Sequence, residues 1–292
     1  MELHKLTIAN LDQPELSADD PDATVWVGGE TKPDIIAKRV GQWCWFRIDE
    51  LATYRFPPSS PDLSVACVAE PFEDRSTGSV IDAYYRSVVP LALQVYGLEA
   101  MHGTAIDTAA GAMVLCGHSH AGKTTLTYAL SRRGHPVLAD DGLVIDVASS
   151  GARVALQPIP FALMIREYSA EHFGTQVRAK VTVSEDAAPT VTVAPVPLAA
   201  VVRLSREKDA ELGVARLSPA EAFRVLLDHC YVFSLDDVGR KGRMMAAYLR
   251  FANTVPVFTL TYPDGLEHLD EAVAAIERLV GELPAQAVST SP

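Results

Sequence analysis

The sequence predicts an α/β protein in which a small β-rich N-terminal lobe precedes a larger α/β domain. Short runs rich in Val, Trp, Phe and Tyr, separated by turn-forming residues, occupy residues 1–78. Beyond residue 98, strand-like runs alternate with runs whose apolar residues recur at helical spacing. A glycine-containing loop, Gly117–Thr124, joins one of these strands to one of these helices. We therefore expect a lobe over residues 1–78, a domain over 79–284 and a frayed tail over 285–292.

Composition and charge exclude several classes of function. The chain has 292 residues, with 25 Lys and Arg against 37 Asp and Glu, so its formal net charge is −12. Binding to duplex nucleic acid without sequence preference needs a basic face, so we expect no nucleic-acid partner. The first 30 residues carry no secretory signal, and no run of about 18 uncharged apolar residues could span a bilayer. The four cysteines lack Cys-x-x-Cys spacing, which favours reduced thiols. We expect a cytoplasmic protein with no membrane partner.

A long helix is predicted between the lobe and the loop, from Ser79 to Tyr96, because apolar residues recur there every three or four positions. Ser79 or Thr77 would cap its start, and Gly97 would end it. Pro90 lacks an N–H and would kink or split the helix. Within the lobe we expect strands at 23–27, 43–48 and 63–69.

Two predicted strands, Glu99–Ile106 and Ala112–Cys116, precede the loop, and a tight turn joins them. A helix over Thr125–Arg133 follows the loop, and a strand over Pro136–Ala139 leads to Asp140-Asp141. Beyond this acid pair we expect strands up to Val147 and at 153–157, 162–166, 198–204 and 257–262. A hairpin should join 181–183 to 191–193. One helix should begin at Ser218, and two more should cover 238–253 and 269–283.

The loop fits the pattern G-x-x-x-x-G-K-[ST], between a strand and a helix as that pattern requires. Gly117 and Gly122 permit backbone angles that turn consecutive N–H groups toward a phosphate, and the helix adds its positive dipole end. Lys123 would bridge two phosphates and Thr124 would bind magnesium. We expect a nucleotide to contact Gly117, His118, Ser119, His120, Ala121, Gly122, Lys123, Thr124 and Thr125.

Three residues near the loop leave more than one interpretation open. His118 and His120 are too few for a zinc site, so each either donates to phosphate oxygens or faces solvent. His102 lies on a strand that should pair with the strand before the loop, and both a structural and a functional role are open.

The acid pair Asp140-Asp141 follows Lys123 after only one helix and one short strand. The returning strand should therefore end beside the loop, which places carboxylates at the terminal phosphate. One acid would hold a metal ion and the other would accept a proton from an attacking hydroxyl. The alternative is a solvated turn, and the apolar residues on both sides of the pair argue against it.

These motifs resemble a known family. Met101–Ala105, Gly117–Thr124 and Arg133–Asp141 resemble, in order and spacing, the catalytic domain of bacterial HPr serine kinase/phosphorylase and its shorter relatives. Those relatives include kinases that are encoded with lasso-peptide biosynthesis genes and phosphorylate a serine of a precursor peptide. The resemblance covers about residues 100–146. It implies a P-loop kinase whose mixed central sheet is like that of phosphoenolpyruvate carboxykinase, with ATP and Mg²⁺ as cofactors.

The resemblance also implies a role for each matching residue. It makes Asp141 the proton acceptor and His102 a catalytic-site histidine, and it makes Asp140 a support either for the metal that Thr124 binds or for Asp141. It implies an arginine near the transferred phosphate, for which the candidates are Arg216, Arg166, Arg203 and Arg206. One departure is Met164, which stands where the family has a magnesium-binding glutamate.

We therefore expect a kinase that transfers the γ-phosphoryl group of ATP to a hydroxyl, with a serine of a peptide or small protein as acceptor. Assembly into a homo-oligomer is consistent with the resemblance. Two alternatives stay open: a small-molecule kinase on the same scaffold, and a nucleotide-binding regulatory or assembly protein that has lost catalysis. Met164 favours the second alternative, and the intact acid pair argues against it.

Overall fold

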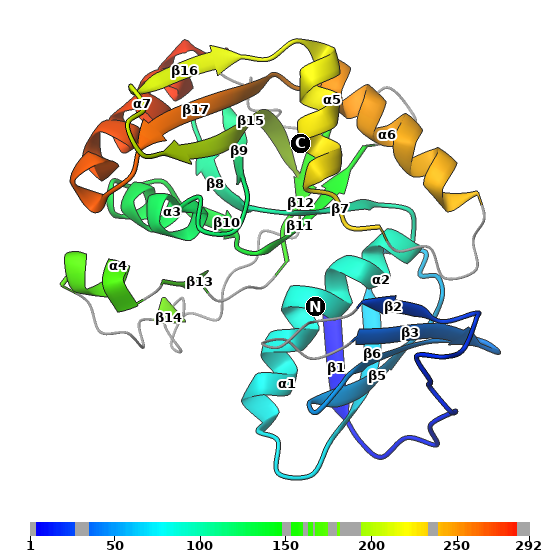
Figure 1. Ribbon diagram of the computed structural model, residues 1–292. Helices are drawn as coiled ribbons and strands as arrows, with labels where there is room; N and C mark the ends of the chain where they lie inside the picture. The colour runs from blue at the N-terminus through cyan, green and yellow to red at the C-terminus, as the bar shows by residue number, and fades with distance from the viewer. Residues whose placement is uncertain are drawn as a thin grey trace, which may run out of the picture. The chain divides into compact units, whose positions relative to one another are not determined.

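The computed structural model describes residues 4–26, 35–147, 153–159, 163–165, 167–174, 180–181, 194–232 and 239–284 (Figure 1). The chain forms two compact units. The first consists of Met1–Ala100 with Tyr231–Met245, and the second of Met101–Cys230 with Ala246–Pro292. The first unit thus extends beyond the lobe boundary expected at residue 78. Most of the expected hairpin at 181–193, the tail 285–292 and Arg166 lie outside the described residues.

The first unit contains a six-stranded mixed sheet in the order β1-β6-β5-β4-β3-β2. β1 runs parallel to β6, and the other pairs are antiparallel. Two buried tyrosines form hydrogen bonds between this sheet and the helical segment that follows it. The Tyr54 hydroxyl of the sheet donates to the Val80 carbonyl, and the Tyr84 hydroxyl of the helical segment donates to the Val65 carbonyl. The strands are β1 (His4–Ile8), β2 (Thr24–Trp26), β3 (Ile35–Val40), β4 (Trp43–Ile48), β5 (Ala52–Phe56) and β6 (Val65–Pro71).

The predicted long helix forms three consecutive segments, α1 (Thr77–Ala83), a π-helical turn η1 (Tyr84–Val88) and α2 (Val89–Val95). Pro90 lies in the first turn of α2, directly after the π-helical turn. The helix is not split in two, because Tyr84, Val88 and Val89 at the junctions all keep right-handed helical backbone angles; a π-helical turn precedes the proline instead. The expected caps at Ser79 or Thr77 were wrong, since the Ser76 hydroxyl accepts the Ser79 N–H at 3.2 Å.

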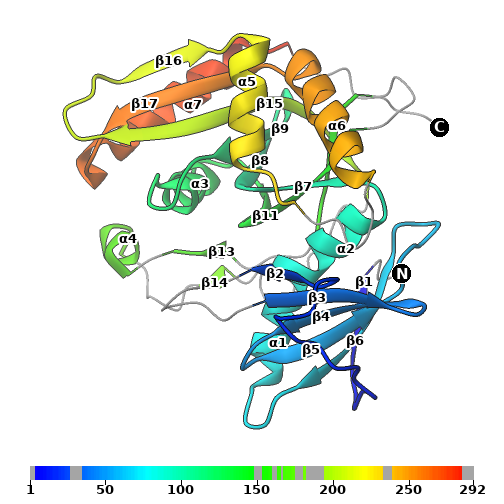
Figure 2. The same cartoon turned by 45° about the vertical axis from the view of Figure 1, so that its right-hand side comes forward.

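The second sheet is also mixed, in the order β10-β8-β9-β15-β12-β11-β7, with β17 beside β15 and β16 beside β17 (Figures 1 and 2). β9 and β17 run parallel to β15. This confirms a mixed α/β protein in which the strand before the glycine loop is central. The strands are β7 (Glu99–His102), β8 (Thr104–Thr108), β9 (Gly111–Cys116), β10 (Val137–Ala139), β11 (Gly142–Asp146), β12 (Ala155–Gln157), β15 (Val196–Glu207), β16 (Gly213–Arg216) and β17 (Val257–Pro263).

The single strand expected over residues 99–106 is interrupted at Gly103 and forms β7 and β8. A Cβ on Gly103 would lie 2.8 Å from the Leu115 carbonyl oxygen, so only glycine permits this close approach to β9. A further two-stranded sheet pairs β13 (Leu163–Met164) with β14 (Lys180–Val181).

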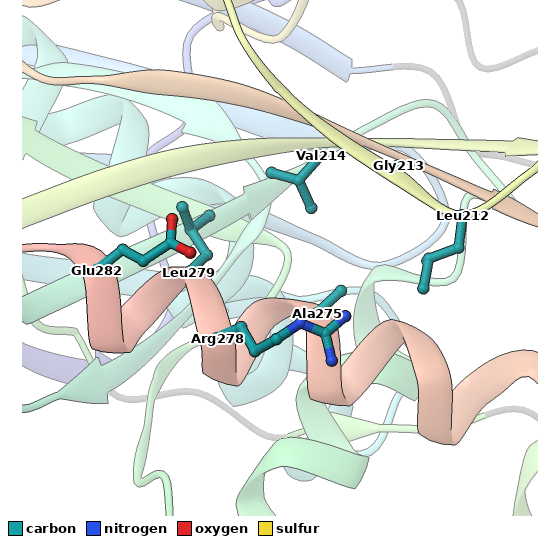
Figure 3. A pocket seen from close by; sticks show the side chains of 7 residues that line it. All are labelled: Leu212, Gly213, Val214, Ala275, Arg278, Leu279 and Glu282. Atoms are coloured by element: carbon teal, nitrogen blue, oxygen red, sulfur yellow. The ribbon is translucent and has the colours of Figure 1, made fainter.

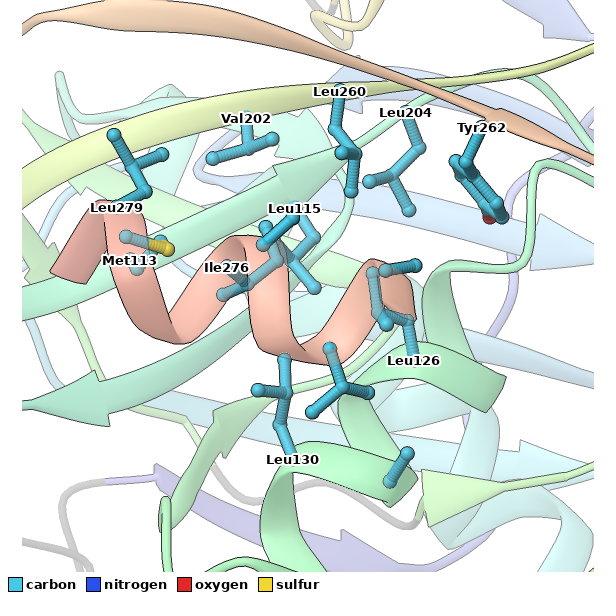
Figure 4. Close-up of a cluster of buried hydrophobic side chains, with 14 of the residues drawn as sticks. Met113, Leu115, Leu126, Leu130, Val202, Leu204, Leu260, Tyr262, Ile276 and Leu279 are labelled. Atoms are coloured by element: carbon cyan, nitrogen blue, oxygen red, sulfur yellow. The ribbon is translucent and has the colours of Figure 1, made fainter. Parts of the chain in front are cut away.

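Helices α3 and α7 cover one face of the second sheet. Figure 4 shows Leu126 and Leu130 of α3 packed with Ile276 and Leu279 of α7 against strand residues such as Leu115. The capping box predicted at Ser218 is present at the start of α5. The helices are α3 (Lys123–Arg132), α4 (Glu167–His172), α5 (Pro219–Asp228), α6 (Arg240–Thr254), the 3-10 turn η2 (Leu266–His268) and α7 (Leu269–Glu282). Within the described residues, every helix falls short of the length and apolarity needed to traverse a bilayer.

Candidate active site

The loop between β9 and α3 turns sharply at three residues in the left-handed region. Gly117 has φ 154°, His120 has φ 69° and Gly122 has φ 84°. A Cβ on Gly117 would lie 2.9 Å from the Leu204 carbonyl oxygen, which explains why glycine begins the loop. The Ala121 N–H donates to the His118 carbonyl at 3.1 Å and closes the turn. The loop therefore delivers the first turn of α3, with its unsatisfied amides, to the carboxyl end of β9.

The Lys123 side chain lies across this loop. Its Nζ donates to the carbonyl oxygens of Gly117 at 2.8 Å and His118 at 3.2 Å. Burial lowers the pKa of the Lys123 amine, while the nearby charges of Asp141 and Asp140 act to raise it. The loop thus holds a cation close enough to the acid pair to interact with both carboxylates.

Asp140 returns to the loop as its sequence spacing predicts. β10 pairs with β8 and ends at Ala139, and the buried Asp140 follows. Its Oδ1 accepts a hydrogen bond from the Thr124 hydroxyl at 3.3 Å. The structure therefore brings together the two oxygen donors expected to hold magnesium. Their role as ligands stays a prediction.

Asp141 has a left-handed backbone (φ 71°), which is uncommon for a residue other than glycine. Its carboxylate Oδ1 lies 3.2 Å from Nδ1 of His102 on β7. The same Nδ1 lies 3.0 Å from the Asp141 carbonyl, and the Gly103 N–H donates to that carbonyl at 3.2 Å. Because a carbonyl oxygen only accepts, Nδ1 of His102 carries the hydrogen. His102 therefore orients Asp141.

His229 adjoins His102 and His118, and its sequence surroundings did not identify it as a site residue. It follows α5 and is 6% exposed, and its ring centroid lies 5.5 Å from that of His118. Its carbonyl accepts the His102 N–H at 2.7 Å. Burial lowers the pKa of His229 to about 4, with further contributions from His118, His102 and Lys123. No local pattern marks this residue, because its partners are more than a hundred positions away.

Stability is expected to fall as the pH falls from about 6.5 to about 4. Burial lowers the pKa of both His4 and His229 from 6.5 to about 4. Between these values the unfolded chain binds protons that the folded chain excludes, so each ring removes on the order of 1–3 kcal/mol of unfolding free energy. Urea unfolding at pH 7 and pH 5 measures the loss. His4→Gln and His229→Gln should each flatten the pH dependence, and an unchanged slope in both variants would contradict the assignment.

The remaining predicted residues fall in different places. Arg216 lies on the outer strand β16, where it pairs with Phe258 of β17, three strand spacings or about 14 Å from β9. Arg216 therefore lies three strands from the strand that leads into the loop, and its role as the phosphate arginine stays a prediction. Arg206 pairs with Asp264 at 3.1 Å. Arg203 is opposite Cys116 in the neighbouring strand and is the arginine of this group placed beside the loop.

Other loop side chains differ in their surroundings. His118, Ser119 and His120 are exposed, whereas the Thr125 hydroxyl is 2.9 Å from that of Ser169 in α4. Thr125 therefore contacts α4 through its side chain. Across the described part of the chain, no three His, Cys, Asp or Glu side chains gather in a way that would hold a metal ion.

A surface groove of about 210 Å³ lies elsewhere in the second unit, between the start of β16 and α7 (Figure 3). Val214 lies on one side of it, and Arg278 and Glu282 of α7 lie on the other. None of the residues that line the groove belongs to the loop, the acid pair or the histidines. The groove therefore shares no residue with the candidate site.

The fold and the site together define a mixed α/β protein with a strand–glycine loop–helix unit beside two carboxylates. No family model and no curated protein matches the chain. Among solved structures, the chain is similar to the Hpr(Ser) kinase/phosphatase from Coxiella burnetii, with 13% sequence identity and a TM-score of 0.32. The match covers 63% of this chain and 98% of that chain. These values do not assign the chain to a family.

Proposed function

We propose that this chain is an ATP- and Mg²⁺-dependent kinase that transfers the γ-phosphoryl group to a hydroxyl, with a serine of a peptide or small protein as the favoured acceptor. The observation that carries the proposal is the division of the acid pair. Asp140 contacts the Thr124 hydroxyl, while Asp141 contacts His102, and both carboxylates interact with Lys123. The phosphoenolpyruvate-carboxykinase-like arrangement and the serine acceptor rest on the motif resemblance over residues 100–146.

The chemistry of the loop supports a triphosphate as its ligand. A Cβ on Gly117 or Gly122 would meet neighbouring atoms at 2.9 Å or less, so the turn has room for main chain only. Amides and one buried ammonium group then provide the donors that phosphate oxygens require. Thr124 and Asp140 offer oxygen ligands, the type that magnesium prefers. Bound magnesium would neutralise charge on the phosphates.

Asp141 would take the proton of the acceptor hydroxyl. The hydroxyl oxygen then forms a bond to the γ-phosphorus as the bond from that phosphorus to the bridging oxygen breaks, and ADP leaves with the electron pair. His102 holds the Asp141 carboxylate through Nδ1–H, so the base needs no reorientation during transfer. Lys123 stabilises the negative charge that develops on the phosphate oxygens.

Lys123→Ala is expected to weaken ATP binding about 10- to 100-fold, because one charge-assisted contact to phosphate is lost. Isothermal titration calorimetry with ATP and Mg²⁺ measures the dissociation constant. Lys5→Ala is the matched control, since Lys5 is an exposed lysine on β1 of the first unit. An unchanged dissociation constant for Lys123→Ala would contradict the assignment of the loop.

The proposed activity itself is tested by Mg²⁺-dependent release of ADP in the presence of serine-containing peptides, with free serine and simple sugars as comparison acceptors. Transfer to peptides supports the proposal. Transfer to the small acceptors alone would replace it with a small-molecule kinase. Tight ATP binding without transfer to any acceptor would instead indicate a nucleotide-binding regulatory protein.

A further inference from the structure

We propose that Tyr262 is a positioning residue that holds the glycine loop in its nucleotide-binding shape at the junction with α3. The inference rests on the proposed function, because it concerns how the loop is kept ready for the phosphates of ATP. Tyr262 lies on β17, a strand that contributes nothing else to the candidate site described above.

The tyrosine is placed for this role by the sheet. Tyr262 pairs with Arg206 of β15, is 5% exposed and belongs to the core cluster beneath α3 and α7. Figure 4 shows it at one edge of this cluster, with Leu126 of α3 as a neighbour. Its hydroxyl donates to the carbonyl oxygen of Ala121 at 2.5 Å. A buried side chain of the sheet therefore binds the main chain of the loop directly.

The contact lies where the loop joins α3. Gly122 is the N-cap of α3 and has a left-handed backbone, and a Cβ there would lie 2.7 Å from the Tyr262 hydroxyl oxygen. The hydroxyl thus uses the space that the glycine leaves. Lys123 follows immediately, so any shift of Ala121 or Gly122 moves the lysine and the first amides of the helix.

Two further observations indicate that Tyr262 takes no part in the proposed proton transfer to Asp141. Burial raises the pKa of Tyr262 to about 12, so its hydroxyl keeps its proton and remains a donor at neutral pH. Asp141 is held by His102 and by the Gly103 N–H, neither of which contacts Tyr262 among the hydrogen bonds described above. Loss of the hydroxyl should therefore affect nucleotide binding and leave proton transfer to Asp141 largely unchanged.

Tyr262→Phe tests the inference, and Tyr54→Phe is its matched control. Tyr54 is also buried, and its hydroxyl also donates to a main-chain carbonyl, that of Val80 at 3.0 Å in the first unit. Both variants lose one buried hydrogen bond of the same kind. We expect Tyr262→Phe alone to raise the dissociation constant and KM for ATP about 3- to 10-fold, with kcat within about twofold of the unaltered protein.

A second measurement makes the inference independent of catalysis. Amide hydrogen exchange at Gly122–Leu126 should be faster in Tyr262→Phe than in Tyr54→Phe, with or without ATP. If the unaltered protein does not bind ATP, the proposed function fails and the exchange data still decide the role of Tyr262. Unchanged exchange and unchanged ATP affinity in Tyr262→Phe would overturn the inference, as would an equal loss of affinity in Tyr54→Phe.

Discussion

Asp141→Asn is expected to abolish phosphoryl transfer while ATP binding is retained. The amide has nearly the same size as the carboxylate but cannot accept the proton of the acceptor hydroxyl. Loss of a general base typically lowers kcat by about 10²- to 10⁴-fold. Asp141 does not contact the loop main chain through any hydrogen bond described here, whereas its carboxylate contacts His102 at 3.2 Å. Steady-state ADP release measures kcat, and calorimetry measures the affinity for ATP.

Two companion variants make this result specific. Asp209→Asn removes an exposed carboxylate from the turn after β15 and should leave kcat unchanged. Asp140→Asn should instead raise the magnesium concentration that is needed for half-maximal activity, because Asp140 contacts Thr124. Turnover by Asp141→Asn at the rate of the unaltered protein would remove Asp141 as the base.

The second large effect is expected on stability, at the ion pair between Glu99 and Arg240 in the first unit. The two side chains are 3% and 7% exposed, and the guanidinium donates to both carboxylate oxygens at 2.9 and 2.7 Å. It also donates to the Leu98 carbonyl at 2.9 Å. Arg240→Met leaves a buried carboxylate without its partner and should lower the free energy of unfolding by about 3–5 kcal/mol. Urea denaturation measures this loss.

The double variant Glu99→Leu/Arg240→Met provides the comparison. Replacing both charges by apolar groups removes the unpaired carboxylate, so much of the lost stability should return. The cycle of the two single variants and the double variant gives the coupling energy. A loss below about 1 kcal/mol in Arg240→Met would show that water reaches the pair in solution.

Local signals account for the parts of the fold that could be predicted. The glycine loop and the capping box at Ser218 depend on residues within a few positions of each other, so their patterns are visible in the sequence. β1 pairs with β6 about sixty residues away, and β16 is exposed along its whole length. Neither strand has the alternation of buried and exposed positions that makes a strand recognisable in a sequence. Each is a strand because it forms hydrogen bonds with a neighbouring strand, and not because one of its faces is buried.

The residues of the candidate site also differ in whether the sequence could predict them. The acid pair could be placed beside the loop because one helix and one strand leave the chain few ways to return. Tyr262 is 141 residues from Ala121, and His229 lies on the connection after α5, so only the folded sheet brings them to the loop. Nothing near Arg216 in the sequence shows that it lies on an edge strand, so its distance from β9 could not be predicted.

The close approach at Gly103 has a practical consequence. The distance between the turn that carries Asp141 and the end of β9 depends on a main-chain contact, because the Gly103 N–H binds the Asp141 carbonyl and its Cα faces the Leu115 carbonyl. Removing a reactive side chain from this region should therefore leave the distance between this turn and β9 unchanged. Under the proposed function, an inactive variant such as Asp141→Asn would retain nucleotide and acceptor together long enough for cocrystallisation or crosslinking.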